Sequence, residues 1–236
     1  MINYQDVIYG NYKKSDYSLK LASHLLEEYD FKPFWSEWCL EECNKLLEVG
    51  FGSGEYLNAF AQLGFETFGI EYDSFYYQGS ASQTYEKTDF NKDRLPYEDN
   101  FFSHVFCKSV LEHLQNPQNL LTEIHRILKK DGKLIILLPS WEYNYRWFYD
   151  DPTHIKPFNR KGLQDLLRMS GFSLPSINIE YFYHLPIFWN FPVLKPIAKL
   201  IRILPDDYRW KDWEQQNMNI FIRFAKEVQL LGVVTK

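Results

Sequence analysis

Residues 46–54 read Leu-Leu-Glu-Val-Gly-Phe-Gly-Ser-Gly, a short apolar run that leads into three glycines at alternate positions. The apolar residues suit a buried strand, and Leu57 marks the start of a helix beyond the glycines. Gly50, Gly52 and Gly54 allow a tight turn and let bare backbone approach a ligand. The stretch therefore predicts a strand, a turn and a helix around a nucleotide-like cofactor.

The spacing of the glycines separates two kinds of cofactor. A dinucleotide-binding turn has the pattern G-x-G-x-x-G, with a helix N-terminus facing a pyrophosphate. Counted from Gly50, the third position of that pattern is Glu55. Carboxylates at Glu48 and Glu55 would repel phosphates, whereas a positively charged ligand tolerates them. The pattern favours S-adenosylmethionine, which carries a sulfonium and an ammonium group and no phosphate, over the NAD of an oxidoreductase.

A second strand is expected at residues 66–71, after a short helix that ends near Gly64. Glu71 would then lie at the carboxyl end of this strand, about twenty residues after the glycine turn. Ligands bind at that edge of doubly wound sheets, and an acidic side chain there can hold both ribose hydroxyls. We predict Glu71 as the ribose ligand.

Five segments, in their order and spacing, resemble the class I S-adenosylmethionine-dependent methyltransferases of types 11 and 23. The resemblance covers roughly residues 40–175 and the last strand. It rests first on the glycine turn, strand 66–71, and Thr88-Asp89-Phe90 as the third strand with the acidic turn 95–102 after it. It rests also on strand 105–108 with Leu-Glu-His-Leu at 111–114, and on the helix and turn 120–132 before strand 133–138. The resemblance implies an α/β fold: a Rossmann-like seven-stranded sheet with helices on both faces. Residues 218–224 and 228–236 suit either the last two strands of this sheet or one strand with its closing partner.

The resemblance also implies the cofactor contacts. Glu48 would approach the amino end of the cofactor, and Asp89 and Phe90 would meet adenine. Lys108 stands where relatives commonly have a small polar residue, so it could instead reach the cofactor carboxylate or an anionic acceptor. The expected cofactor-binding residues are Glu48, Gly50, Gly52, Gly54, Glu71, Tyr72, Asp89, Phe90, Lys108 and Ser109.

We expect one methyltransferase domain over residues 1–236, with three additions to the minimal βα alternation. Residues 1–40 hold a helix near 16–29, either a lid over the cofactor or a helix packed on the flank of the sheet. Residues 181–215 form an insertion. Prolines and basic residues within its apolar stretch 185–204 argue against a transmembrane helix. An interfacial helix, a substrate cap and a homodimer surface remain as alternatives, with membrane contact disfavoured.

The third addition, residues 139–158, is long for a βα loop and follows the strand at 133–138. It combines aromatic residues with charged ones at the sheet edge where ligands bind, so we expect it to bind the acceptor through Trp141, Arg146 and Asp151. Its end, residues 151–158, resembles an Asp-Pro-Thr-His stretch of methyltransferases associated with bacterial surface-glycan loci. That resemblance favours O-methylation of a sugar, a glycan intermediate or a related polar metabolite.

A hydroxyl acceptor needs a base, because its pKa lies far above neutral, and histidine suits this task. His113 follows the fourth strand, and His154 lies in the acceptor loop with Asp151 three residues earlier. Both are candidates for the base. His125 lies beside an apolar helix stripe and is assigned to packing, and His104 stands where relatives often have aspartate.

Composition excludes several other classes. The chain has 236 residues, of which 45% are hydrophobic, enough to bury the core of a single domain. A net charge of −5 without a lysine–arginine block argues against a nucleic-acid substrate. Cys39, Cys43 and Cys107 suggest neither a disulfide framework nor a metal site, and no signal-peptide core is evident, so we expect a cytoplasmic protein without metal. A catalytically inactive cofactor-binding partner subunit is the alternative function.

Overall fold

A computed structural model describes residues 17–31, 44–72, 84–205, 208, 210–212, 217–218, 222 and 225–236. Its strands are β1 (Lys45–Val49), β2 (Glu66–Glu71), β3 (Thr84–Lys87), β4 (Phe102–Lys108), β5 (Leu128–Pro139), β6 (Ile177–Tyr183), β7 (Trp210–Asp212), β8 (Asn217–Met218) and β9 (Val228–Thr235). Its helices are α2 (Tyr17–Glu28), α3 (Glu55–Gln62), α4 (Pro117–Ile127), α5 (Trp141–Asn144), α6 (Arg160–Met169), α7 (Ile187–Asn190) and α8 (Lys195–Ile201). Short 3-10 turns are η2 (Leu111–His113), η3 (Phe148–Asp150), η4 (Leu174–Ser176) and η5 (Pro192–Leu194).

The central sheet has the order β3-β2-β1-β4-β5-β9-β6. β1 to β5 pair in parallel, whereas β9 runs antiparallel to both β5 and β6. The carboxyl ends of the five parallel strands therefore meet at one edge. The order reverses between β1 and β4, the position where doubly wound sheets bind ligands. This topology confirms the predicted Rossmann-like α/β fold.

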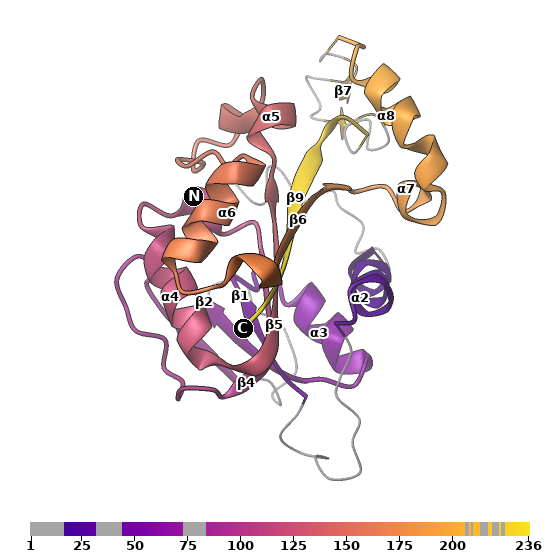
Figure 1. Ribbon diagram of the computed structural model, residues 1–236. Helices are drawn as coiled ribbons and strands as arrows, with labels where there is room; N and C mark the ends of the chain where they lie inside the picture. Colours follow the sequence, from indigo (N-terminus) through magenta and orange to yellow (C-terminus); the bar gives the residue numbers. More distant parts are fainter. Residues whose placement is uncertain are drawn as a thin grey trace.

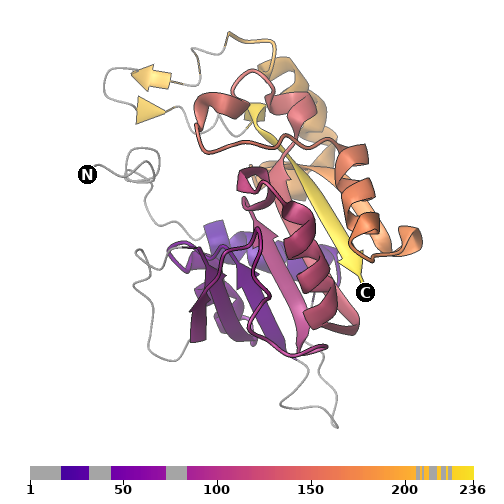
Figure 2. The same ribbon diagram turned by 90° about the vertical axis from the view of Figure 1, so that its left-hand side faces the viewer.

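Two apolar layers hold the helices on the faces of the sheet. α4 and α6 cover one face and α2 and α3 the other (Figures 1 and 2). Along β1, Leu47 packs with the α4 side of the core and Leu46 with the α3 side, as alternating side chains of a doubly covered strand should. The near-continuous apolar sequence of the strands follows from this two-sided burial.

The predicted helix near residues 16–29 is present as α2, with its apolar stripe buried. Leu21, Ala22 and Leu25 are fully buried and pack in the same core cluster as Phe60 of α3. The described helix thus packs on the flank of the sheet. The remainder of the proposed lid, residues 1–16 and 32–40, lies outside the described residues.

Two strand positions differ from the sequence prediction. The third strand is β3 at Thr84–Lys87, and residues 88–90 lie beyond it and lead into a turn in which the Asp89 carbonyl accepts hydrogen bonds from Lys92 N and Asp93 N. Asp89 causes this, because its carboxylate accepts a hydrogen bond from the Asn91 backbone 3.1 Å away and favours a local turn over a ladder. At the other end, β9 pairs with β6 rather than with residues 218–224. Of that predicted strand, only residues 218 and 222 are described.

The expected insertion begins at His184, because residues 181–183 still belong to β6. The following residues form α7, η5 and α8, which lie at the same end of the molecule as α5 (Figure 1). The Trp189 ring stacks on His24 of α2 at a centroid distance of 4.7 Å, and Phe188 and Ala198 are buried. Within the described ranges, no helix is long and apolar enough to cross a membrane.

Candidate functional site

The glycine turn after β1 adopts a conformation that glycine alone accepts readily. Gly50, Gly52 and Gly54 have φ values of 72°, 52° and 79°. A Cβ added to Gly50 would lie 2.3 Å from a Val110 methyl carbon, whereas a Cβ on Gly52 would meet nothing within 4 Å. The first glycine is therefore needed for packing, and the second presents bare backbone to open space where a ligand can approach.

Glu71 is attached to this turn from the neighbouring strand. One carboxylate oxygen accepts a hydrogen bond from Gly52 N at 2.9 Å, and the other accepts one from Tyr72 N at 2.8 Å. The contact with Gly52 places the predicted ribose ligand at the glycine turn, although 19 residues separate the two in sequence. A carboxylate offers acceptor sites on both oxygens, the chemistry that binding two vicinal hydroxyls requires.

The predicted adenine-contacting pair has two different environments. The Asp89 carboxylate forms an ion pair with Lys92 at 3.2 Å, and the hydrogen bond from Asn91 N lowers the pKa of Asp89. The Phe90 ring is buried in the core cluster on the α4 side. Any contact of Phe90 with adenine would therefore involve its backbone. Asp89 stands in the turn that follows β3, at the same edge as Glu71.

Two titratable residues of opposite type, Glu48 and Lys108, lie at the carboxyl ends of β1 and β4, next to the glycine turn. Glu48 on β1 is 2% exposed, and burial raises its pKa well above the usual value. Burial lowers the pKa of Lys108 at the end of β4, while Glu112 and Glu48 oppose that shift. Glu48 Oε2 has no hydrogen-bond partner among the described residues. It is therefore suited to accept a hydrogen bond from the amino group of a cofactor. Ser109, next to Lys108, has a φ of 54° and donates its N–H to Leu137 O at 2.8 Å.

The two candidate bases come together because the acceptor loop folds back onto η2. The backbone carbonyl of Glu112 accepts hydrogen bonds from Ile155 N at 2.9 Å and Lys156 N at 3.0 Å. These bonds bring the His113 and His154 rings to a centroid distance of 4.8 Å. The structure thus unites residues that the sequence offered as separate alternatives.

Hydrogen-bond partners assign the tautomer of each ring. The Asp151 carboxylate can only accept, so the Thr153 hydroxyl donates to it at 2.5 Å and must itself accept from His113 Nδ1 at 3.0 Å. His154 Nδ1 donates to the Phe148 carbonyl at 2.6 Å. Each neutral ring therefore carries its lone pair on Nε2. Burial, and then the charge of His154, lower the pKa of His113 and keep its ring neutral at pH 7.

Glu112 lies beside His113 and His154, and the sequence did not reveal it as a site residue. Its side chain is fully buried, and neither carboxylate oxygen has a hydrogen-bond partner in the described part of the chain. Burial raises its pKa to about 8, so it is largely protonated at neutral pH. The ligand atoms of Glu112, His113 and His154 lie within 4.8 Å of one another and could hold a divalent cation. The expectation of no metal rested on Cys39 and Cys43, which lie outside the described residues.

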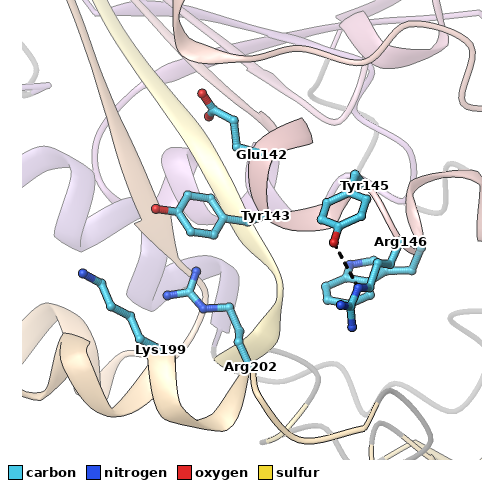
Figure 3. Close-up of a pocket in the computed structure, with 7 residues that line it drawn as sticks. Glu142, Tyr143, Tyr145, Arg146, Lys199 and Arg202 are labelled. Carbon is cyan, nitrogen blue, oxygen red and sulfur yellow. Dashed lines mark hydrogen bonds between the residues drawn. The ribbon is translucent and has the colours of Figure 1, made fainter.

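The acceptor loop also forms a pocket. Trp141 donates its backbone N–H to Phe158 O at 2.8 Å, and its ring packs edge-on against Phe148 at 5.6 Å. Beside α5 is a cavity of about 450 Å³ (Figure 3). It is lined by Glu142, Tyr143, Tyr145, Arg146, Trp147, Lys199 and Arg202. Arg146 was predicted, whereas Lys199 and Arg202 come from the insertion and gave no local signal in the sequence.

A family model described as a methyltransferase domain matches residues 20–177, more than half of the chain. The chain belongs to this methyltransferase family. A methyltransferase relative of known structure, the S-adenosylmethionine-dependent enzyme from Archaeoglobus fulgidus, has a TM-score of 0.64 at 20% identity, over 99% of this chain and 100% of that chain. The putative methyltransferase in complex with the Haloferax volcanii Trm112 activator has a TM-score of 0.66 at 20% identity, over 98% and 93%.

Two further similarities cover less of the related protein. Phosphoethanolamine N-methyltransferase 2 from Haemonchus contortus, in complex with S-adenosylmethionine, has a TM-score of 0.56 at 16% identity, over 100% of this chain and 60% of that chain. An uncharacterized protein from Methanocaldococcus jannaschii is 38% identical over 90 residues, 35% of this methyltransferase and 40% of that protein. This match thus spans less than half the length of that relative.

The family match, together with the shared fold, confirms the prediction of a class I S-adenosylmethionine-dependent methyltransferase. It also removes the reason for considering an NAD-dependent oxidoreductase. The glycine turn that suggested the cofactor lies within the matched residues.

Proposed function

We propose that this methyltransferase transfers the methyl group of S-adenosylmethionine to a hydroxyl of a sugar, a glycan intermediate or a related small polar metabolite. His113 and His154 would form the proton-accepting group. The observation that carries the proposal is the pair of imidazoles whose Nδ1 atoms are hydrogen-bonded to Thr153 and to the Phe148 carbonyl, which directs the Nε2 atoms to accept, next to the strand ends that present the glycine turn and Glu71.

Methyl transfer from a sulfonium is a direct displacement, so the protein mainly positions the reactants. The acceptor oxygen must lose its proton as the new carbon–oxygen bond forms, and an imidazole Nε2 can take it. Proton uptake at His113 leaves an imidazolium that the Asp151 carboxylate stabilises through Thr153. Asp151 also lies 3.7 Å from His154 Nε2 and would stabilise a charge on that ring.

In this proposal the cofactor lies along the carboxyl edge of β1, β2 and β4. Glu71 would bind its ribose, Glu48 its amino group and the turn after β3 its adenine. Gly52, whose missing side chain leaves open space, would admit the methionine part. Trp141, Arg146 and Asp151 would surround the acceptor from the loop after β5.

The acceptor class is supported by residues rather than by the structural relatives. The stretch from Asp151 to Phe158 supplies His154 itself and Thr153, which is hydrogen-bonded to His113. Its last residue, Phe158, forms a parallel backbone bridge with Ser140 before α5. A polar metabolite also suits the net charge of −5, which disfavours a nucleic acid. We place the reaction in the cytoplasm as part of the same proposal.

A metal-assisted form of this reaction is the competing mechanism, favoured by the arrangement of Glu112, His113 and His154. A cation there would lower the pKa of the bound hydroxyl and replace the imidazole base. The two forms differ in one simple way: only the second loses activity with a chelator.

We also retain a homodimer in the proposal, because apolar side chains of the insertion are exposed. Val193 is 81%, Leu200 66% and Ile203 78% exposed. Exposed apolar residues of this kind occur at contacts between proteins. Light scattering during size-exclusion chromatography would show one peak at the mass of two chains; a peak at 28.4 kDa would contradict the dimer.

The function is tested by incubating the full chain with labelled S-adenosylmethionine and a panel of hydroxylated sugars, sugar phosphates and sugar nucleotides, with and without EDTA. Mass spectrometry should detect a methylated product whose formation is insensitive to EDTA. Loss of activity with EDTA would select the metal-assisted mechanism. Binding of the cofactor without methylation of any panel member would instead support a catalytically inactive partner subunit.

A further inference from the structure

The cavity beside α5 has a strongly cationic lining. Arg146, Lys199 and Arg202 supply three positive charges, and Glu142 supplies the one carboxylate among the lining residues. Glu142 accepts hydrogen bonds from Tyr181 OH at 2.9 Å and Ser140 Oγ at 3.3 Å, and in Figure 3 its carboxylate points away from the three cations. The cavity therefore favours an anionic ligand.

Arg202 is positioned to bind such a ligand. Its guanidinium carbon lies 4.5 Å from the Tyr143 ring centroid, and its Nη2 is 3.4 Å from Tyr183 OH. Its Nη1 is buried and has no hydrogen-bond partner among the described residues. A buried guanidinium N–H without an acceptor is costly, so a ligand oxygen at this position would be stabilised. Lys199, one helical turn earlier, is exposed and can reach the same group.

The opposite wall offers an aromatic surface. Tyr145 is 52% exposed, and the Arg146 guanidinium lies 5.8 Å from its ring centroid. A planar or sugar ring can pack against this pair. The volume of about 450 Å³ falls within the usual range for small-molecule sites, and a single phosphate would leave most of it empty. The occupant should thus combine an anionic group with a ring.

We propose that this cavity binds the nucleoside diphosphate part of a nucleotide-linked acceptor. The phosphates would lie between Lys199 and Arg202, and the nucleobase would pack against Tyr145 and Arg146. The inference rests on the proposed function in one respect: the hydroxyl that is methylated belongs to the group attached to the diphosphate. The loop at residues 139–158 connects the cavity with His113 and His154. Within it, the Trp141 ring packs on Phe148, and the Phe148 ring lies 4.6 Å from that of His154, measured between centroids.

The test measures binding rather than turnover. The full chain is saturated with S-adenosylhomocysteine, which occupies the cofactor site, and is then titrated in a calorimeter with UDP, GDP, uridine, guanosine and pyrophosphate. We expect one nucleoside diphosphate to bind at least about tenfold more tightly than its nucleoside and than pyrophosphate, the effect of one good charge-assisted hydrogen bond or one stacked base.

Substitutions in the cavity test whether the diphosphate binds there. Arg202→Gln and Lys199→Met should each weaken diphosphate binding by about tenfold or more. Lys199 is an exposed helix residue, so its variant keeps the test valid if the Arg202 variant folds poorly. The matched control is Arg168→Gln on α6, an exposed arginine that pairs with Asp165 outside the cavity. It should bind the diphosphate as the unmodified chain does.

Three results would overturn the inference. In the first, the nucleoside diphosphates bind no more tightly than the nucleosides, or do not bind at all. In the second, diphosphate binding is unchanged in both the Arg202→Gln and the Lys199→Met variants. In the third, pyrophosphate binds as tightly as the nucleoside diphosphates. Failure of the proposed function would appear differently. In that case S-adenosylhomocysteine itself would not bind, or a bound diphosphate-linked sugar would not be methylated.

Discussion

The rings of His113 and His154 have centroids 4.8 Å apart and are inclined at 53°, although one residue follows β4 and the other follows β5. Each ring is fixed through Nδ1, by Thr153 and by the Phe148 carbonyl, which leaves the two Nε2 atoms as proton acceptors. A charge on one ring disfavours a charge on the other, and His154 indeed lowers the pKa of His113. A charge on His154 therefore opposes protonation of His113.

Replacing either histidine should slow methyl transfer without weakening cofactor binding. We expect His113→Gln or His154→Gln to lower kcat by about 10²–10⁴, the usual contribution of general-base catalysis. Because the pKa of His113 is lowered from 6.5, the midpoint of the acid-side fall in kcat/KM of the unmodified enzyme should lie below pH 6.5. His125→Gln is the control, since His125 packs on Phe172 at 4.9 Å. Full activity of both site variants would contradict the assignment.

Thr153 provides a finer test, because it connects His113 to Asp151. Thr153→Val keeps the shape of the side chain but removes the hydroxyl that accepts from His113 Nδ1 and donates to Asp151. We expect about a tenfold or larger loss of kcat, with recovery in Thr153→Ser, whose hydroxyl can restore both bonds. Steady-state kinetics measure kcat for the two variants and the unmodified enzyme. Equal rates for Val and Ser would show that the connection has no catalytic role.

The cofactor half of the site could be predicted from sequence because its signals are local. Gly50, Gly52 and Gly54 all adopt positive φ values, and Glu71 follows at the end of the next strand, so the spacing along the chain predicted that they lie together. The association of His113 with His154 depends instead on backbone bonds from residues 155 and 156 to the Glu112 carbonyl. Backbone contacts between distant residues leave no side-chain pattern, so the sequence offered the two histidines only as alternatives.

The same reasoning explains the remaining errors. Asp89 was placed in a strand because the turn it caps was not recognised, and its hydrogen bond to Asn91 N reveals that turn only in three dimensions. β6 was missed as the partner of β9 because an antiparallel pairing across the sheet depends on topology rather than on local sequence. Arg202 reaches the acceptor loop only because the insertion packs back against α5.

Glu112 should affect stability in a pH-dependent manner. Its folded-state pKa of about 8 lies above the usual 4.5, so the folded chain retains a proton that the unfolded chain loses between these values. The free energy of unfolding therefore falls as pH rises through this window, by at most about 1.4 kcal/mol per pH unit. Glu112→Gln cannot titrate. It should thus gain stability relative to the unmodified chain between about pH 5 and about pH 8.

Urea denaturation in EDTA at about pH 5 and about pH 8 measures how the free energy of unfolding changes with pH. Glu98→Gln, at an exposed position, is the control. Parallel pH profiles for the Glu112 variant and the unmodified chain would contradict the assignment of a buried, protonated acid. A stabilisation by added divalent cation that disappears in Glu112→Gln would identify the residue as a metal ligand instead.

Two glycines of the turn should respond differently to alanine. At Gly50 a Cβ would clash with Val110 at 2.3 Å in addition to straining a φ of 72°, so Gly50→Ala should destabilise the fold by about 2–4 kcal/mol. At Gly52 the Cβ meets open space, so Gly52→Ala should cost only about 1–2 kcal/mol of backbone strain while obstructing the cofactor. Thermal denaturation and S-adenosylhomocysteine binding separate the two effects. Equal destabilisation by both variants would contradict this account of the turn.

Calorimetric titration with S-adenosylhomocysteine tests the central claim most directly, with Glu71→Ala and Glu66→Ala compared side by side. Both glutamates belong to β2, but Glu66 is exposed at its start and Glu71 touches the glycine turn at its end. We predict binding by the unmodified chain and by Glu66→Ala, and binding at least about tenfold weaker by Glu71→Ala. No binding by the unmodified chain, or equal binding by both variants, would contradict the cofactor site described.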